Sequence, residues 1–382
     1  MMKYFYLIMG GVLLLASSCS KSRKNVDDSQ QISDAIHVNF IEQPLRGSQF
    51  LKDCKVIFLS SEHDEGLIAN VDRLLVGDDR YFVMDRRTNR LMAFDGHGEF
   101  IASTARYIGE GPDSYIRIID AAIDNKAKKV YVQCDLPYCI MVFDMNLQLE
   151  KKIGLDYYMV EIADDDKYIY GIRARYDSDF GNELIALDKE NLLAEPVVML
   201  EYSKVVIGAG AIGKSLTSYG NGVNVCLPFD NVVYQISNRE IVARYSLDFG
   251  VNGVDYSDIK DMSANQFFDS SYREKIWSIV NVYSSDSTLF FGCNRVYSFT
   301  LNRSTKNCSG FSAWRNDLMP YSVTRTFPVD GLDNAYAYLC RSEHVMDFIS
   351  RVSEERLGAD LKKALKGYEE EDNPLIFICE MK

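Results

Sequence analysis

The sequence predicts an all-β fold, a six-bladed β-propeller with short helical insertions. A hairpin of two apolar runs recurs along the chain, and these runs are rich in Val, Ile, Tyr and Phe, which favour strands. The 382 residues include 24 Tyr and 20 Phe but only 8 Pro, a composition that suits many strands. Successive hairpins start roughly 40 to 65 residues apart, close to or somewhat beyond the propeller period of about 40–50. The hairpins occupy residues 81–95, 130–144, 168–188, 223–237, 288–300 and 335–380.

The clearest copy runs from Tyr81 to Tyr115 and contains three strand-like runs, a Gly96/Gly98 turn and a Gly-Pro loop. This is most of one four-stranded blade. A single blade exposes two apolar faces, so it is stable only when neighbours stack on it in a closed ring. We expect residues 375–380 to supply inner strands of the closing blade. Either residues 37–40 or residues 54–59 then add its outer strand.

Two stretches follow helical spacing instead. Residues 342–366 carry apolar side chains at helical intervals, with Ser342 as the expected N-cap. Ser263 and Gln266 form a capping-box pattern before a shorter apolar stretch. We expect both helices to be insertions on one face of the ring, where they act either as a binding surface or as lids over strand ends.

The N-terminus predicts export and a lipid anchor. Residues 1–18 combine Lys3, an apolar run and small residues that end directly at Cys19, the pattern of a bacterial lipoprotein signal. This pattern implies cleavage before Cys19 and attachment of a diacylglycerol to its thiol. Residues 19–36 lack an apolar period and are expected to form a flexible tether. The predicted domains are therefore the signal at 1–18, the tether at 19–36 and the propeller at 37–382.

Composition and motifs exclude several functions. A net charge of −13 argues against a nucleic-acid surface. The run from Gly208 to Ser215 matches phosphate-loop patterns, but turn residues follow it where a helix is required, which argues against nucleotide binding. The four His show no metal-ligand spacing. The run Asp164 to Asp166 is interpreted as a solvated turn in preference to a cation site.

Eight cysteines remain beyond Cys19. Cys134 and Cys139 flank a tight hairpin and are a possible disulfide pair in an exported protein. Most of the others, Cys379 included, lie in apolar runs, where a Cys behaves as a small hydrophobic residue. We therefore expect the cysteines to be mainly core residues. No CxxC motif supports a zinc or redox site.

The 81–95 hairpin and the loop Gly109-Glu110-Gly111-Pro112-Asp113-Ser114-Tyr115 that follows it resemble the six-bladed, NHL-like β-propeller lipoproteins of Bacteroidetes. Residues 229–250 and 372–382 are similar to the same group. Asp113 and Ser114 replace its usual Gly-Glu. The resemblance covers essentially the mature chain. It implies a propeller fold and a location in the cell envelope, with the periplasmic face favoured over the cell surface. It implies no reaction, because that family is largely uncharacterised.

The loop 104–117 supplies the candidate binding residues, namely Arg106, Tyr107, Glu110 and Tyr115. The alternative is that this loop only shapes the crossing between blades. We expect a lipoprotein, anchored to the membrane through its N-terminal lipid, whose propeller binds a glycan, a peptide or an envelope protein, without identifiable catalysis and without a cofactor. The alternative function is a lactonase-like hydrolase or lyase that uses calcium or another divalent cation in the central channel. Such ligands are distant in sequence, so spacing neither confirms nor excludes them.

Overall fold

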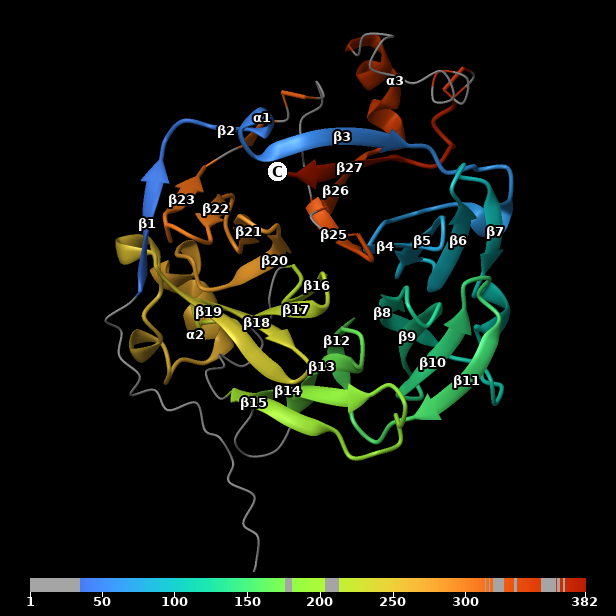
Figure 1. The fold of residues 1–382 in the computed structure, drawn as a ribbon, viewed down its shortest axis with the longest axis horizontal. Coiled ribbons are helices and arrows are strands. Elements are labelled where there is room, and N and C mark those ends of the chain that lie inside the picture. Colours follow the sequence, from blue (N-terminus) through green and yellow to red (C-terminus); the bar gives the residue numbers. More distant parts are fainter. Residues whose placement is uncertain are drawn as a thin grey trace, which may run out of the picture.

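The computed structural model describes residues 35–175, 181–202, 213–312, 314–315, 317–318, 326–332, 335–351, 362, 365–366 and 368–382. Its strands form four-stranded antiparallel units that follow one another around a ring, a propeller-like arrangement (Figure 1). None of its described helices is long and apolar enough to cross a membrane. Cys19 lies outside the described residues.

Most units are built from four consecutive strands, as the recurring hairpins predict. The first comprises β4 (Arg73–Gly77), β5 (Arg80–Asp85), β6 (Arg90–Asp95) and β7 (Phe100–Ser103). The second comprises β8 (Arg117–Asp124), β9 (Lys129–Asp135), β10 (Cys139–Asp144) and β11 (Leu149–Gly154). The third comprises β12 (Met159–Asp164), β13 (Tyr168–Arg175), β14 (Gly181–Asp188) and β15 (Val197–Tyr202).

The next two units follow the same plan. One comprises β16 (Leu216–Tyr219), β17 (Gly222–Cys226), β18 (Val232–Ser237) and β19 (Glu240–Asp248). The other comprises β20 (Ile279–Ser284), β21 (Thr288–Cys293), β22 (Ser298–Asn302) and β23 (Cys308–Phe311). Strand β1 (Ile36–Ile41) lies between the outer strands β19 and β23 and pairs with both in parallel.

The closing unit joins the two ends of the chain. It comprises β25 (Thr326–Asp330), β26 (Ala335–Cys340), β27 (Leu375–Met381) and, as its outer strand, β3 (Leu51–Ile57). The prediction that residues near Cys54 close the ring against residues 375–380 is therefore confirmed. The alternative, residues 37–40, belongs to β1 instead. The short strands β2 (Leu45–Arg46) and β24 (Trp314–Arg315) pair with each other beside this unit.

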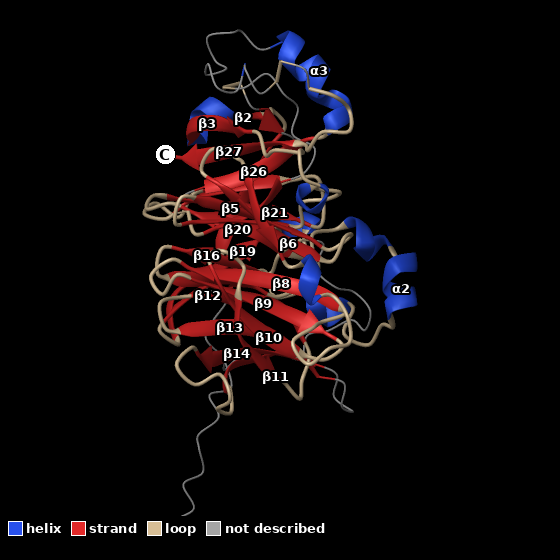
Figure 2. Ribbon diagram, turned by 90° about the vertical axis from the view of Figure 1, so that its right-hand side faces the viewer, coloured by secondary structure: helices blue, strands red, loops and turns tan. Residues whose placement is uncertain are grey.

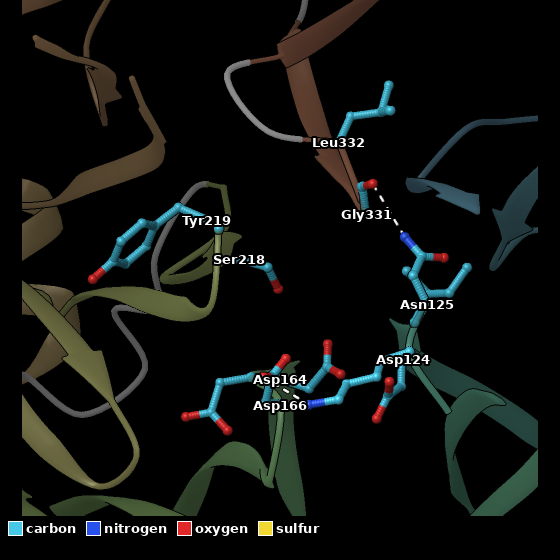
Figure 3. A pocket seen from close by; sticks show the side chains of 12 residues that line it. Asp124, Asn125, Asp164, Asp166, Ser218, Tyr219, Gly331 and Leu332 are labelled. Carbon is cyan, nitrogen blue, oxygen red and sulfur yellow. Dashed lines mark hydrogen bonds and ion pairs between the residues drawn. The ribbon is translucent and has the colours of Figure 1, made fainter. Parts of the chain in front are cut away.

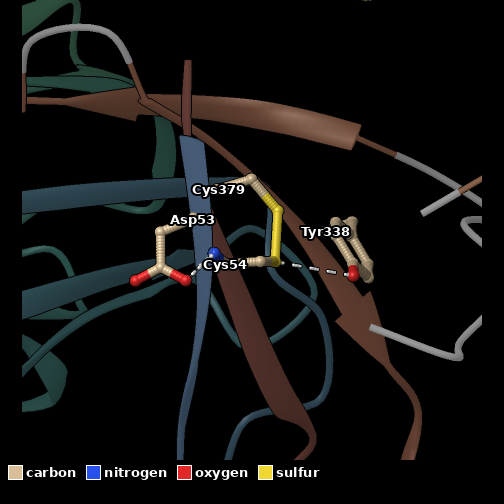
Figure 4. Close-up of a disulfide and its surroundings, with 4 residues drawn as sticks. All are labelled: Asp53, Cys54, Tyr338 and Cys379. Carbon is tan, nitrogen blue, oxygen red and sulfur yellow. Dashed lines mark hydrogen bonds between the residues drawn. A yellow bond between two sulfur atoms is a disulfide. The ribbon is translucent and has the colours of Figure 1, made fainter. Parts of the chain in front are cut away.

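A disulfide fixes this closure. Cys54 on β3 lies directly opposite Cys379 on β27, with their Cα atoms 4.2 Å apart, and the two sulfurs are bonded (Figure 4). The expectation that Cys379 is only a core hydrophobe is wrong, because the antiparallel register brings it onto a cysteine 325 residues away. Cys134 and Cys139 also face each other, across β9 and β10, but both are free thiols.

Each pair of neighbouring units shares a buried hydrophobic core. Leu75 and Phe82 of the first unit, for example, belong to the same cluster as Val132 and Met141 of the second. The other interfaces around the ring are built in the same way. Since each blade covers the apolar face of the next, burial of these faces drives ring formation.

Short helices decorate the ring. The α-helices are α1 (Gly47–Phe50), α2 (Ala264–Asp269) and α3 (Ser342–Arg351). The 3₁₀ turns are η2 (Asp64–Gly66), η3 (Ala105–Tyr107), η4 (Gly250–Asn252), η5 (Tyr256–Asp258) and η6 (Ser271–Glu274). The predicted capping box is present at the start of α2. Helices α2 and α3 lie on the same side of the ring, as expected (Figure 2). We call this side the helical face.

Candidate functional site

Three of the six innermost strands carry an acidic residue at their carboxyl end. Strand β8 ends at Asp124, β12 ends at Asp164 and β25 ends at Asp330. Neighbouring innermost strands contact one another around the axis of the ring. Because these strands run in the same direction along the axis, their carboxyl ends meet at the face opposite the helical face.

A cavity of about 250 Å³ lies at this meeting point, and we call it the mouth pocket (Figure 3). Its walls come from the ends of β8, β12, β16 and β25 and the loops that follow these strands. The lining residues are Ile123, Asp124, Asn125, Lys126, Asp164, Asp165, Asp166, Ser218, Tyr219, Gly220, Gly331 and Leu332. A site built from several units exists only when the ring is closed.

A buried ion triad lies at the base of the pocket. The Nζ atom of Lys189 lies 2.6 Å from Oδ2 of Asp124 and 2.7 Å from Oδ2 of Asp164, and it also donates to the carbonyl of Asp165 at 2.5 Å. Burial raises the pKa of Asp164 to about 7; Lys189 opposes the rise, while Asp124 and Asp330 add to it. Asp164 therefore changes its charge near neutral pH.

The acidic run is not the solvated turn that the sequence suggested. Asp164 and Asp165 are buried, and only Asp166 reaches solvent, where it pairs with Lys126. The Oδ1 atom of Asp165 accepts hydrogen bonds from the amides of residues 167 and 168, and its Oδ2 accepts from the Tyr170 hydroxyl and the amide of residue 238. The turn is buried because the next unit packs over it and supplies donors that replace water.

A second group of charges lies deeper along the axis, and we call it the axial cluster. It consists of Arg73, Asp120, Glu161, Lys214 and Asp330. The guanidinium of Arg73, fully buried, donates from Nε to Asp330 at 2.5 Å and from Nη1 to Asp120 at 2.6 Å. Its Nη1 also donates to the carbonyl of Ile162 at 2.9 Å. Arg73, at the start of the first unit, thereby contacts three other units of the ring.

Lys214 enters the axial cluster from the fourth unit. Its Nζ atom donates to Oδ1 of Asp120 at 2.8 Å, and its backbone amide donates to Oδ1 of Asn281 at 2.8 Å. Burial opposes ionisation of Asp120, but Arg73 and Lys214 outweigh this effect and hold the pKa of Asp120 below its ordinary value. Lys214 is the lysine of the glycine-rich motif. The described residues of that motif lead into strand β16, and the absence of nucleotide binding stays a prediction.

Glu161 completes the axial cluster through backbone contacts. Its Oε2 atom accepts hydrogen bonds from the amides of Ser215 at 2.8 Å and Leu216 at 3.0 Å. Burial raises the pKa of Glu161 above its ordinary value, and Lys214 only partly offsets this effect. Its position ties the third unit to the start of the innermost strand of the fourth.

Two of the oxygen atoms at the pocket that have no hydrogen-bond partner among the described residues lie near the buried ion triad. One is the buried Oγ atom of Ser218. The other is Oδ1 of Asp164, whose Oδ2 alone contacts Lys189. Both residues line the mouth pocket. The pocket therefore offers acceptors that a ligand can use.

The residues proposed from the sequence lie elsewhere. The loop with Arg106, Tyr107, Glu110 and Tyr115 precedes β8, whereas the mouth pocket lies at the far end of that eight-residue strand. Arg106 and Glu110 are exposed. Arg106 stacks on the ring of Tyr107 at 4.8 Å and donates to Gln148 at 2.7 Å.

Tyr115 has no exposed surface, and its hydroxyl contacts Thr104 at 2.6 Å and the carbonyl of residue 89 at 2.8 Å. It therefore shapes the loop from beneath. A binding role for this loop remains a prediction. Among the residues that the structure describes, no group of three or more His, Cys, Asp or Glu is arranged to hold a metal ion. The divalent-cation alternative also remains a prediction.

No local sequence pattern indicates the axial cluster. Arg73 begins β4, Asp120 lies within β8 and Asp330 ends β25, and Arg73 lies 257 residues from Asp330. The recurring signal is an Asp at the last position of three innermost strands, namely Asp124, Asp164 and Asp330. That signal becomes visible only when the strands are aligned by unit.

Among the solved structures compared, one supports the fold. The chain is similar to a crystal structure of a Bacteroides fragilis protein described as exported, with a TM-score of 0.65 and 15% identity, covering 91% of this chain and 100% of that chain. It is also similar to BamB from Moraxella catarrhalis, with a TM-score of 0.42 and 10% identity, covering 75% of this chain and 72% of that chain. For the WD40 β-propeller domain of Doa1 the TM-score is 0.41 and the identity is 9%, and the match covers 77% of this chain and 83% of that chain. At these identities, the likeness concerns the fold alone.

Sequence comparison gives a family without an activity. No curated protein matches the chain. The family described as Domain of unknown function (DUF4934) matches residues 34–380, which is nearly all of the described fold. The chain therefore belongs to the DUF4934 family.

Proposed function

We propose that this protein is an exported, lipid-anchored, six-bladed β-propeller that binds a small polar ligand in the mouth pocket. The observation that carries the proposal is the pocket itself, where side chains from four units converge. There the buried Oγ atom of Ser218 and the Oδ1 atom of Asp164 have no hydrogen-bond partner among the described residues. Ligand sites in proteins are concave and combine a largely preformed wall with a few convergent polar groups. The mouth pocket has both properties.

The six-blade interpretation rests on the strand ladders and the cores. Each antiparallel unit has four strands, and the last uses β3 to complete itself. The parallel pairing of β25 with β4 brings the last and first units together. Since a shared core also lies between these two units, the ring needs no further blade to cover an apolar face.

The proposed location rests on the N-terminal pattern and on one relative. Residues 1–19 have the form of a lipoprotein signal, and the Bacteroides fragilis protein of similar fold is described as exported. The disulfide between Cys54 and Cys379 is consistent with an oxidising compartment. We place the protein in the cell envelope, on the periplasmic side. A glycan, a peptide or an envelope protein is the proposed partner class, and the loop with Arg106, Tyr107 and Glu110 is a second candidate contact surface.

A ligand screen tests the pocket. Thermal shift is measured with sugars, amino acids, amines and short peptides on the wild type and on Ser218→Leu, which fills the pocket with a larger side chain. Hits that stabilise the wild type but not Ser218→Leu support the proposal, since binding to the folded state raises its stability. If no hit depends on Ser218, the mouth pocket is not the binding site.

Metabolic labelling with a fatty-acid analogue tests the anchor. The full-length protein should incorporate the label and fractionate with membranes, whereas Cys19→Ala should do neither. Labelling that persists in Cys19→Ala would contradict the proposed attachment site.

A further inference from the structure

We propose that the mouth pocket takes an organic cation, a ligand that carries a primary ammonium or guanidinium group. This inference rests on the proposed function, because it names the chemical class of the ligand at the same site. Three observations lead to it, namely the balance of charge around the pocket, the hydrogen bonds that its lysines already make, and the position of its free acceptors.

The charge around the pocket is negative. The lining includes four carboxylates, Asp124, Asp164, Asp165 and Asp166, but only one cation, Lys126. Lys189 adds a second positive charge just below. With all groups ionised, the site carries two more negative charges than positive ones. In a partly buried site this excess is weakly screened, so a positive ligand is favoured and an anion is repelled.

Both lysines already pair with carboxylates, and Lys189 has no hydrogen left to donate to an anionic ligand. An ammonium group has three hydrogens to donate, and Lys189 directs its donors to Asp124, Asp164 and the carbonyl of Asp165. Lys126 is exposed at the rim and pairs with Asp166 at 3.3 Å. A phosphate or carboxylate would have to displace these contacts.

The free groups are acceptors. Oδ1 of Asp164 carries no hydrogen bond among the described residues, and the Oγ atom of Ser218 is buried without a partner. The two side chains project toward the same space between the strand ends (Figure 3). A carboxylate oxygen and a hydroxyl oxygen complement the N–H groups of an ammonium or guanidinium.

A bare divalent cation fits this arrangement less well. Calcium takes six to eight oxygen ligands and magnesium six in near-octahedral geometry. Both oxygens of Asp165 already accept two hydrogen bonds each, and both oxygens of Asp124 also accept donors. The acceptors that remain suit the few directed donors of an organic cation.

Binding should depend on pH through Asp164. The groups that face this carboxylate are Lys189, Asp124 and Asp330, from three different units of the ring. The pKa of Asp164 is about 7, so its ionised fraction rises about tenfold between pH 6 and pH 8. A cation binds the ionised form. Its affinity should therefore rise by up to about tenfold over this interval if only Asp164 titrates.

The test uses three probes of one shape on the full-length protein. They are n-butylammonium, n-butanol and butyrate, measured by saturation-transfer NMR and calorimetric titration at pH 8. We expect n-butylammonium to bind at least tenfold more tightly than n-butanol, and butyrate to show no binding. Asp164→Asn and Ser218→Ala should each weaken amine binding by about fivefold or more. Asp269→Asn, an exposed carboxylate on the helical face, is the matched control and should leave binding unchanged.

The outcomes separate the inference from the proposed function. Equal binding of n-butanol, or tighter binding of butyrate, overturns the cation inference but leaves a ligand site in the pocket. A screening hit that requires Ser218 while n-butylammonium does not bind has the same consequence. If neither the probes nor the screen gives binding that Ser218→Leu removes, both proposals fail. Should Asp164→Asn fold poorly, Ser218→Ala decides alone, because it removes only one hydroxyl.

Discussion

Removal of the Arg73 side chain should destabilise the protein strongly. Arg73 is completely buried and holds two carboxylates, Asp120 and Asp330, in the axial cluster. Arg73→Met keeps much of the apolar volume of the side chain but deletes its charge and its donors. The substitution leaves two buried carboxylates short of a partner, which is the costly way to break a buried ion pair.

The size of the expected loss of stability follows from the hydrogen bonds that each carboxylate keeps when Arg73 is removed. Asp120 keeps Lys214 at 2.8 Å and the amide of Ile162 at 2.9 Å. Among the described residues, Asp330 keeps only the amide of Ser218, at 3.5 Å. Removal of one partner from a buried pair costs about 3–5 kcal/mol, so we expect about 4 kcal/mol, mostly from Asp330. With an unfolding entropy of about 2.1 cal/mol/K per residue over about 350 residues, the melting temperature should fall by about 5 °C.

The assay is thermal and denaturant unfolding of a double-mutant cycle. Arg73→Met, Asp330→Asn and the double variant are compared with the wild type, because the cycle isolates the coupling between the two residues. The double variant should regain about half of the free energy of unfolding that Arg73→Met loses, since a neutral amide tolerates burial better than a lone carboxylate. Arg273→Met is the control. Arg273 is 56% exposed beside Glu274, so its loss should cost less than about 1 kcal/mol.

Two results would refute this reasoning. One is a cost below about 1 kcal/mol for Arg73→Met, which would mean that water or a rearranged side chain replaces the guanidinium. The other is an unchanged cost in the double variant, which would mean that Asp330 is not the group left without a partner. A smaller loss at low pH would agree with the reasoning, because protonation neutralises the orphaned carboxylate.

Three further predictions concern stability. The pKa of Asp164 is about 7 in the folded state and about 4 in the unfolded state. Between these values the folded state holds an extra proton, so the stability of the protein falls as the pH rises from about 4 to about 7. Asp164→Asn should reduce this pH dependence, which melting curves at pH 5 and pH 8 measure. Replacing both Cys54 and Cys379 with Ala should cost about 2–5 kcal/mol in denaturant unfolding, and reduction of the wild type should have a similar effect. Gly331→Ala should lower the free energy of unfolding by more than about 1 kcal/mol, because the φ of Gly331 is +82° and a new Cβ would lie 2.0 Å from a backbone carbonyl oxygen. Gly154→Ala is the control, and it should change the melting temperature little because the space around Gly154 is open.

The repetitive part of the fold was predictable from local pattern. Each hairpin places two apolar runs next to each other in sequence, and the strand period of two sends alternate side chains to opposite faces. The closing strand was also predictable as one of two alternatives, since residues 54–59 form a largely apolar run that the recurring hairpins do not use. The end of the longer helix was not tested beyond Arg351, because most of residues 352–367 lie outside the described part.

The site was not predictable, for a different physical reason. A run of three Asp has the composition of a solvated turn, and only the tertiary neighbours of Asp164 and Asp165 show that they are buried. Lys189, which pairs with Asp164, lies in the loop after β14 and gives no local signal. The search for binding residues favoured the loop with Arg106 because its glycines and aromatics stand out. Tyr115, one of those aromatic residues, packs beneath the loop.

Ring closure and the mouth pocket share one structural element. Strand β25 carries Asp330 and Gly331 into the pocket region, and it belongs to the unit that β3 and the Cys54–Cys379 disulfide complete. On its other side β25 pairs in parallel with β4, and Arg73 at the start of β4 binds Asp330. The ion pair therefore spans the seam between the first and last units. Because the pocket wall stands on this seam, a change that loosens the closure should also displace Gly331 and Ser218 relative to each other and weaken any ligand held between them.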